Sequence, residues 1–274
     1  MSRNRNQADT HETSLRLKEE IEKGNYYEAL QLYKTSFARL RIQGKKIDAY
    51  KLLTEGTISL ATKSEKNAAT ELALLLIESL EEDFQKKDDA KIFVYDLNEV
   101  KQYEKISLEE SCNMLLEIAN SYQTSINQII FLKRAVKFLG NNTNPKANGL
   151  RLKLAQSYET MGEYGLAARF YSTTGKVEDY ASLLERWAVK GYKNEQELFF
   201  CRAILHLLSI KREEDAAKIW DLIARNFSNT SKLGQFTLLL ITMVRNRPIP
   251  PTQESSQSFT MFKDTFNFYI QRDS

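Results

Sequence analysis

The stretch that decides the fold is Gly24-Asn25-Tyr26-Tyr27-Glu28-Ala29, because the chain repeats it. It returns as Gly44-Lys45-Lys46-Ile47-Asp48-Ala49, as Gly162-Glu163-Tyr164-Gly165-Leu166-Ala167 and, with lysine for glycine, as Lys211-Arg212-Glu213-Glu214-Asp215-Ala216. Each copy lies between two segments whose apolar residues recur at helical spacing. We expect the glycine to adopt the left-handed conformation that ends one helix, and the alanine to let the next helix pack closely.

The spacing of the copies predicts the architecture. Gly24 and Gly44 are 20 residues apart, so a helix pair takes about 40 residues, between the tetratricopeptide and HEAT repeat lengths. The most tetratricopeptide-like unit runs from Leu154 to Tyr171. Stacked helix pairs of this kind form solenoids. The sequence therefore predicts an all-α protein, an α-solenoid of about six or seven tetratricopeptide/HEAT-like helix pairs.

The prolines and helix caps agree with this prediction. Of four prolines in 274 residues the first is Pro145, and the other three lie within 248–251. A β-sandwich or barrel, with turns every ~8–12 residues, rarely avoids proline for so long. Helices are predicted to start at the capping box Ser107–Glu110, at Asn144 followed by Pro145, and at Asn194 with Glu197.

The same signals divide the chain. We expect a polar leader over residues 1–10, an N-terminal solenoid half over 11–143 and a C-terminal half over 144–274. Residues 92–95 (Ile-Phe-Val-Tyr) could form a short extended piece in a long connector. The prolines of 248–251 interrupt the helices before a last, phenylalanine-rich one.

No motif predicts catalysis. The chain has no glycine-rich phosphate loop, no serine nucleophile motif and no zinc-binding or CxxC pattern, so we expect neither enzymatic activity nor a cofactor or metal. Cys112 and Cys201 form no disulfide framework, which fits a reducing compartment, and Cys112 is expected in the core. His206 is expected to be a helix residue that is buried or at the edge of the core. The start lacks a signal peptide and no apolar run could span a bilayer, which predicts a soluble protein of the cytosol.

Charge is concentrated in two places. Residues 31–46 contain five cations and no carboxylate, and we call these cations the basic stripe: Lys34, Arg39, Arg41, Lys45 and Lys46. Lys34, Arg41 and Lys45 share one helix face. The stripe is either an ordinary solvated face or, since like charges repel, a surface covered by an acidic partner. Most of the acids from Glu71 to Asp89 are expected at a helix C-terminus, where acids are mildly unfavourable.

Aromatic residues are candidates for partner binding in both halves. Of Tyr26 and Tyr27, one is expected in the core and the other available to a partner. In the C-terminal half Phe199, Trp220 and Phe236 exceed what one buried stripe requires. Most such residues are core, although a groove for a partner helix uses the same residue types.

These residues resemble a known family. Gly24 to Gln31, Arg39 and the stretch 67–72 (Asn-Ala-Ala-Thr-Glu-Leu) are similar to the N-terminal half of Golgi to ER traffic protein 4, an adaptor of the guided-entry pathway for tail-anchored membrane proteins. The resemblance covers residues 14–85 and, more weakly, 146–245, and is poor over 84–140. Residues 226–232 are too short for the β-hairpin that some members carry there.

The resemblance implies a non-enzymatic solenoid in which the N-terminal half docks on a dimeric targeting ATPase and the C-terminal half holds a ubiquitin-like-domain partner. It implies no nucleic acid and no direct membrane insertion. Carried over by position, the ATPase contact includes Arg39 as an anchor and Glu71 as a regulator of hydrolysis, with Tyr26, Tyr27, Lys34 and Arg41 nearby. Phe199, Trp220 and Phe236 are the candidates for the ubiquitin-like partner. A generic tetratricopeptide-like scaffold and an RNA-binding solenoid remain the alternatives.

Overall fold

The structure, a computed structural model, describes residues 16–17, 19–90, 106–140, 144–228 and 231–246. Within these ranges all regular structure is helical and no strand occurs. Contacts divide the chain into two compact units, Met1–Thr174 and Gly175–Ser274. The predicted leader and the predicted extended piece at 92–95 lie outside the described residues.

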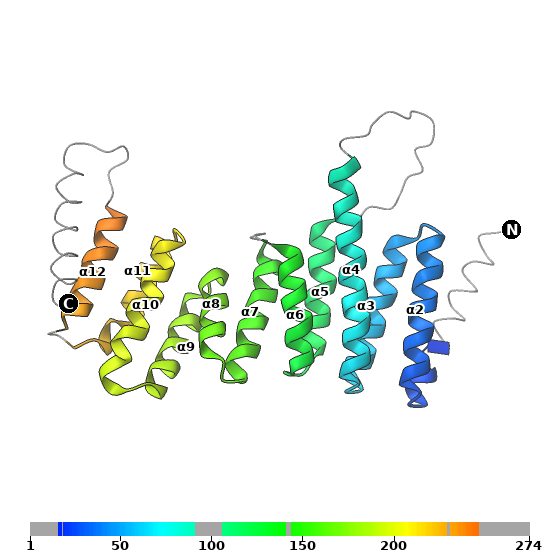
Figure 1. The fold of residues 1–274 in the computed structure, drawn as a ribbon, viewed down its shortest axis with the longest axis horizontal. Helices are drawn as coiled ribbons and strands as arrows, with labels where there is room; N and C mark the ends of the chain where they lie inside the picture. Colours follow the sequence, from blue (N-terminus) through cyan, green and yellow to red (C-terminus); the bar gives the residue numbers. More distant parts are fainter. Residues whose placement is uncertain (1–15, 18, 91–105, 141–143, 229–230, 247–274) are drawn as a thin grey trace, which may run out of the picture. The chain divides into compact units, whose positions relative to one another are not determined.

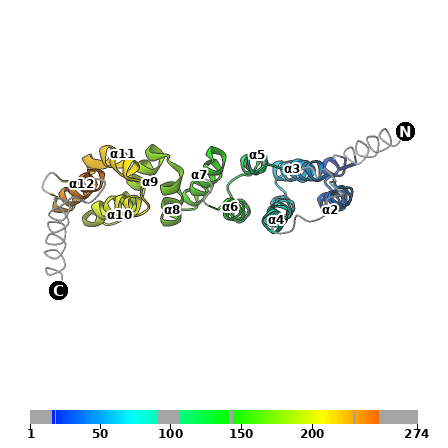
Figure 2. The same ribbon diagram turned by 90° about the horizontal axis from the view of Figure 1, so that it is seen from above.

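The first unit is a double layer of antiparallel helices (Figures 1 and 2). One layer holds α2 (Tyr26–Ile42), α4 (Lys66–Ala90), α6 (Ile126–Leu139) and α8 (Tyr164–Thr174). The other layer holds α3 (Lys46–Thr62), α5 (Leu108–Ser121) and α7 (Pro145–Thr160). Most helices that are adjacent in sequence pack against each other. Within the layers α4 contacts α2 and α6, and α5 contacts α3 and α7, as in a solenoid.

The second unit repeats the pattern. The helices α9 (Val177–Lys190) and α11 (Glu213–Ile223) pack together, and so do α10 (Gln196–Ser209) and α12 (Lys232–Arg245). Short 3₁₀ turns, η1 (Lys193–Glu195) and η2 (Ala224–Asn226), precede α10 and follow α11. The contacts group α7 and α8 with the first unit, so the boundary between the two units lies after Thr174 and not at residue 143. The predicted functional halves, 11–143 and 144–274, stay a prediction.

The repeated corner has the predicted geometry. Gly24, Gly44 and Gly162 have φ of 80°, 78° and 82°, and Lys211, in the glycine position of the fourth copy, has φ 61°. In each copy this residue's N–H bonds to the carbonyl three residues back, and the next N–H to the carbonyl five back. These bonds satisfy the last carbonyls of the preceding helix.

A fifth corner, at Ser64, has no sequence signature. Ser64 has φ 67°, its N–H donates to the Ala61 carbonyl, and the N–H of Glu65 donates to the Leu60 carbonyl, as in the other corners. It lies 20 residues after Gly44, which continues the spacing that Gly24 and Gly44 set. The alanine five residues after each corner residue is fully buried in all five copies: Ala29, Ala49, Ala69, Ala167 and Ala216. A small side chain at this position lets the paired helices approach closely.

The predicted helix starts have mixed outcomes. The capping box is confirmed at α5, where Ser107 accepts from the Glu110 N–H and Glu110 accepts from the Ser107 N–H. Asn144 caps α7 and Pro145 occupies its first position, as predicted. The start at Asn194 is wrong, because this residue lies in η1 and α10 begins at Gln196 without a side-chain cap.

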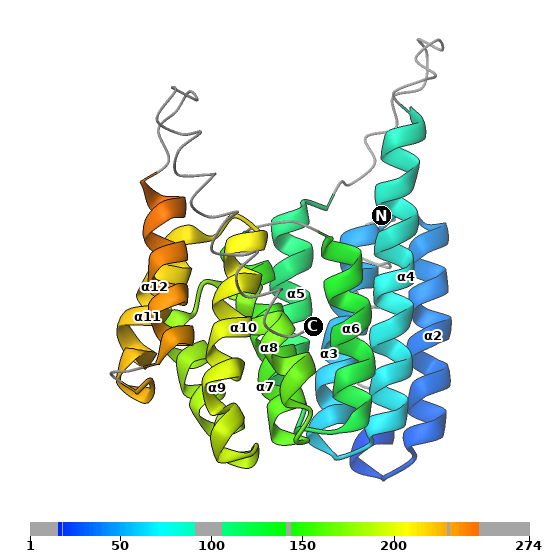
Figure 3. The ribbon, with the colours of Figure 1, turned by 60° about the vertical axis from the view of Figure 1, so that its left-hand side comes forward.

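The acidic stretch also differs from prediction. We expected its acids to end a helix, but α4 continues for 25 residues to Ala90 and extends beyond its neighbours at one end (Figure 3). Glu81, Glu82 and Asp83 therefore lie inside α4. This places their side chains beside α2, α3 and α6 rather than at a helix end.

Candidate partner-binding surfaces

The basic stripe is largely neutralised by the chain's own α4. Arg41 and Lys46 both contact the carboxylate of Asp83, each at 2.9 Å, and Arg41 also lies 3.5 Å from Glu82. Lys34 forms an ion pair with Glu71. The repulsion that we inferred from the sequence is therefore relieved within the first unit, by acids that follow the cations by 37 to 42 residues.

Asp83 is the centre of a polar cluster that joins three helices. It accepts hydrogen bonds from Tyr50 (2.6 Å), Arg41 and Lys46 (2.9 Å each), while the Tyr50 hydroxyl accepts one from Arg41 at 2.8 Å. Burial raises the pKa of the Asp83 carboxyl, but these donors outweigh it and the pKa is lowered overall. Burial and the bond to Asp83 raise the pKa of the Tyr50 phenol. The three charged side chains of the cluster are 10 to 27% exposed. We therefore assign the cluster a structural role, which is to hold the three helices together.

The ion pair between Lys34 and Glu71 lies nearer to solvent. The two side chains are 31% and 53% exposed, and they connect α2 to α4. Glu71 can therefore exchange Lys34 for a cation of a partner at small cost, since exposed pairs contribute only about 0–1 kcal/mol. The family resemblance implies a partner-facing role for Glu71, and its exposure is compatible with that role.

Arg39 stands apart from these pairs. It is exposed on the last turn of α2, and within the described part of the chain no carboxylate pairs with it. Five residues separate it from Lys34, a rotation of about 140° around the helix, so the two cations do not share a face. Its apolar neighbour on the outer face is Ile42, which is 87% exposed.

The structure thus places the predicted ATPase-facing residues at separate points of α2 and α4. It brings together Lys34 with Glu71, and Arg41 with Asp83, whereas Arg39 faces elsewhere. Of the two tyrosines Tyr27 is exposed by 74%, as expected for one of them, whereas Tyr26 is only partly buried and does not belong to the core. Sequence reasoning did not select Ile42, Tyr50 or Asp83. The available sequence signal for Ile42 was its position three residues after Arg39, which places an apolar side chain beside a cation on one helix face.

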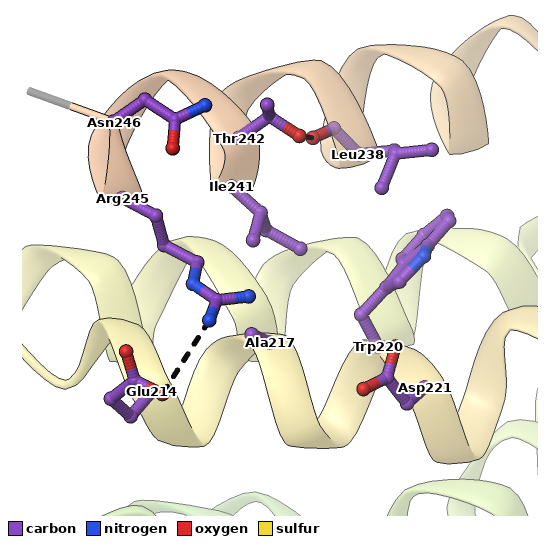
Figure 4. A pocket seen from close by; sticks show the side chains of 9 residues that line it. All are labelled: Glu214, Ala217, Trp220, Asp221, Leu238, Ile241, Thr242, Arg245 and Asn246. Carbon is purple, nitrogen blue, oxygen red and sulfur yellow. Dashed lines mark hydrogen bonds and ion pairs between the residues drawn. The ribbon is translucent and has the colours of Figure 1, made fainter.

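In the second unit a groove runs between α11 and α12 (Figure 4). Its volume is about 470 Å³. Its apolar lining comes from Ala217 and Trp220 on α11 and from Leu238 and Ile241 on α12. Polar residues lie along its edges: Glu214, Asp221, Thr242, Arg245 and Asn246. Arg245 and Glu214 approach each other to 3.8 Å across one end.

Only Trp220 of the three predicted aromatic residues lines this groove. It is partly buried, with its ring centroid 5.1 Å from that of Phe227. Phe199 packs edge-on against Trp187, at a centroid distance of 4.9 Å, at the start of α10. Phe236 is partly buried on α12. The structure therefore does not gather these three residues into one site.

The connection between α11 and α12 is held by two carboxylates of other helices. Glu185 of α9 accepts hydrogen bonds from Arg225 (2.9 Å) and Asn226 (3.0 Å). Glu197 of α10 accepts from the Ser228 N–H at 3.0 Å and from the Ser231 hydroxyl, which in turn caps α12. Glu197 thus fixes this connection instead of capping its own helix, and no strand occurs in the described part of it.

Cys112 is in the core as expected, whereas His206, expected to be buried or at the edge, is exposed. Cys112 is fully buried, and Cys201 is buried with Thr237 as hydrogen-bond donor at 3.4 Å; burial raises the pKa of both thiols. His206 lies exposed on α10. Among the described residues no three His, Cys, Asp or Glu side chains converge on a metal-sized site. None of the described helices has the length and apolarity that crossing a bilayer requires.

Comparison with known sequences agrees with the resemblance. The family model described as Golgi to ER traffic protein 4 matches residues 43–274. The Golgi to ER traffic protein 4 homolog of Oryzias latipes is 26% identical over 242 residues, 88% of this chain and 69% of the relative. The homolog of Gallus gallus is 26% identical over 244 residues, covering 88% and 67%. The match includes residues 84–140, where the resemblance is poorest, and begins after α2.

The fold comparison agrees as well. The crystal structure of C. therm. Get4 aligns with 94% of this chain and 84% of its own, with a TM-score of 0.66 at 17% identity. The prediction of an all-α solenoid is confirmed. Because the family model covers well over half of the residues, the chain belongs to the Golgi to ER traffic protein 4 family.

Proposed function

We propose that this chain is a non-enzymatic adaptor in the post-translational targeting of tail-anchored membrane proteins to the ER. It bridges a dimeric targeting ATPase, bound by the N-terminal half, and a ubiquitin-like-domain partner, bound by the C-terminal half. Family membership supports a role in Golgi to ER traffic. The stacked helix pairs support the adaptor role, because such folds offer extended surfaces to other proteins.

The observation that carries the ATPase contact is the state of Arg39. Lys34, Arg41 and Lys46 are engaged by acids of α4, whereas Arg39 is exposed and unpaired within the described residues. Beside it Ile42 exposes 87% of its surface. A free arginine next to an exposed apolar side chain is a typical anchor of a protein interface, since the guanidinium binds carboxylates and the apolar group fills a pocket.

For the ubiquitin-like partner, the groove between α11 and α12 is the feature that supports a contact on the second unit. Trp220 provides an aromatic anchor and Leu238 an apolar wall, with charged residues along the edges. This composition fits an amphipathic helix of a partner. Phe199 and Phe236 are proposed as secondary contacts, since part of each residue stays exposed.

Calorimetry with the purified ATPase in its nucleotide-bound form tests the anchor. Arg39→Glu is expected to weaken binding by about 2 kcal/mol or more, because a charge-assisted pair is replaced by repulsion. Lys133→Glu is the matched control, since Lys133 is an exposed lysine of α6 on the same unit and should bind as the parent does. Unchanged affinity of Arg39→Glu at low salt would refute the assignment.

The structure does not favour the two alternatives. A clamp for acidic peptide tails and an RNA-binding surface both require several free cations close together. In the basic stripe, Lys34, Arg41 and Lys46 are already paired with acids of the same chain. Three of the five cations of the stripe are therefore already compensated and are not available to either ligand.

A further inference from the structure

We propose that the outer surface of α6 and α8 is a docking site for an acidic amphipathic helix of a partner protein. The site lies within the first unit, and it is separate from the residues assigned above to the ATPase and to the ubiquitin-like partner. We call it the α6–α8 face, and its members are exposed apolar residues and cations: Ile126, Ile130, Lys133, Lys137, Leu166 and Arg169.

The members on α6 lie on the side of this helix that no neighbouring helix covers. The four residues occupy positions i, i+4, i+7 and i+11, which is one helix face. Two other sides of α6 are occupied, since Arg134 pairs with Glu81 of α4 and Gln128 bonds to Ser157 of α7. The exposed side is rotated away from both contacts and therefore points outward from the layer.

The apolar members are at one end of the face. Ile126 and Ile130 are 64% and 46% exposed in the first two turns of α6, and Leu166 is 41% exposed in the first turn of α8. The helices α6 and α8 belong to the same layer, and both pack against α7 (Figure 2). Large apolar side chains exposed on neighbouring helices are typical contacts for the apolar side of a docked helix.

The other end of the face is basic and lacks a counter-charge. Neither α6 nor α8 contains a carboxylate. Lys133, Lys137 and Arg169 are exposed, and no carboxylate of the described residues forms an ion pair with any of them. Three cations without acids favour a ligand that brings carboxylates. The partner helix should therefore carry its acids beside one end of its apolar side.

The neighbouring helix α4 favours a narrow ligand over a broad anionic one. Its exposed side is acidic, with Glu71, Glu78 and Glu82 at i, i+7 and i+11. An anionic membrane or an RNA that covers the layer would meet these carboxylates and be repelled. A single helix, about 10–12 Å wide, can follow α6 and α8 without covering α4. A symmetric dimer through this face is disfavoured as well, because α6 and α8 offer no carboxylate to the cations of a second copy.

A synthetic peptide tests the chemistry of the face. The probe is a fluorescein-labelled helical peptide of about 14 residues, the length of α6, with leucines on one face and glutamates beside one end of that face. Its anisotropy should rise when the purified chain is added, and added salt should weaken this binding. Analogues with lysine for glutamate or alanine for leucine should bind at least about tenfold more weakly. An acidic peptide that fails to bind, or that binds no better than its analogues, would overturn the proposal.

Variants with matched charge locate the peptide. Lys133→Glu with Lys137→Glu should weaken its binding at least about tenfold. Lys51→Glu with Lys153→Glu is the control, because it changes the net charge equally on α3 and α7 and should leave binding as it is. Circular dichroism checks that all variants are folded. Equal losses in the two double variants would show an effect of net charge alone and contradict the site.

Photo-cross-linking gives a readout on the unmodified chain. A benzophenone in the leucine half of the peptide should label α6 and α8 near Ile126 and Leu166, as mass spectrometry after proteolysis would show. Labelling concentrated on α2, on α4 or in the second unit would refute the placement. Neither the ATPase nor the ubiquitin-like partner is present in these assays, so their failure leaves the proposed adaptor role to its own test.

Discussion

The hydroxyl of Tyr50 lies 2.6 Å from the carboxylate of Asp83, and this contact joins α3 to α4. Arg41 of α2 bonds to both groups, so three consecutive helices of the first unit share one polar cluster. The acid is needed here, because without it two partly buried cations, Arg41 and Lys46, would face each other.

Asp83→Asn should destabilise the first unit by about 2 kcal/mol at neutral pH, since it removes the charge that both cations require. Urea unfolding followed by circular dichroism measures the change. Glu82→Gln is the matched control, because Glu82 is the adjacent acid, is 61% exposed and lies 3.5 Å from Arg41. It should cost no more than about 0.5 kcal/mol. Equal effects of the two variants would contradict the role given to Asp83.

The same cluster predicts a pH dependence. The pKa of Asp83 is lowered in the folded chain from its ordinary value of 3.8. Its contribution is therefore complete above about pH 4 and is lost as the pH falls through the lowered pKa. The difference in unfolding free energy between the parent and Asp83→Asn should shrink below pH 4. A difference that stays constant between pH 7 and pH 3 would show that the Asp83 charge does not contribute.

Ser64 and Gly44 give opposite predictions at equivalent corners. Ser64→Gly should stabilise the chain by about 0.5–1 kcal/mol, because relief of left-handed strain exceeds the added entropy of the unfolded glycine. Gly44→Ala should destabilise it by about 1 kcal/mol, although a Cβ there meets no atom within 4 Å, since only backbone strain opposes it. Denaturation midpoints measure both changes. Shifts of the same sign would refute the common geometry of these corners.

Glu71 should act on ATP hydrolysis more than on affinity. Glu71→Lys is expected to change the hydrolysis rate of the ATPase in the complex, because the acid no longer meets a cation of the partner. Glu78→Lys is the control, since Glu78 is exposed seven residues further along the same helix. It should leave the rate as it is. A rate unaltered by Glu71→Lys, at saturating concentrations of the chain, contradicts the assignment.

The fold was predictable because its signal is local. A positive φ at a helix end favours glycine, so Gly24, Gly44 and Gly162 marked three corners directly. The corner at Ser64 could not be predicted in this way, because a serine does not indicate a positive φ. Only its spacing of 20 residues from Gly44 indicates it. The length of α4 was also missed, because acids inside a helix and acids at its end look alike in sequence.

The candidate surfaces were less predictable because their contacts are not local. Arg41 and Asp83 are 42 residues apart, and no pattern within α2 shows that Asp83 neutralises its cation. Sequence could therefore not separate the engaged Arg41 from the exposed Arg39, two residues away on the same helix. Likewise the groove at Trp220 forms only because α11 and α12 pack side by side. The sequence alone does not show that Trp220 lines a groove and Phe199 does not, because both are aromatic residues in predicted helices.

The most direct test of the adaptor role is size-exclusion chromatography with light scattering on the purified chain mixed with the targeting ATPase, nucleotide and the ubiquitin-like partner. We predict one complex that contains all three proteins, from which Arg39→Glu removes the ATPase alone. A chain that binds either protein but never both together would contradict the bridging role.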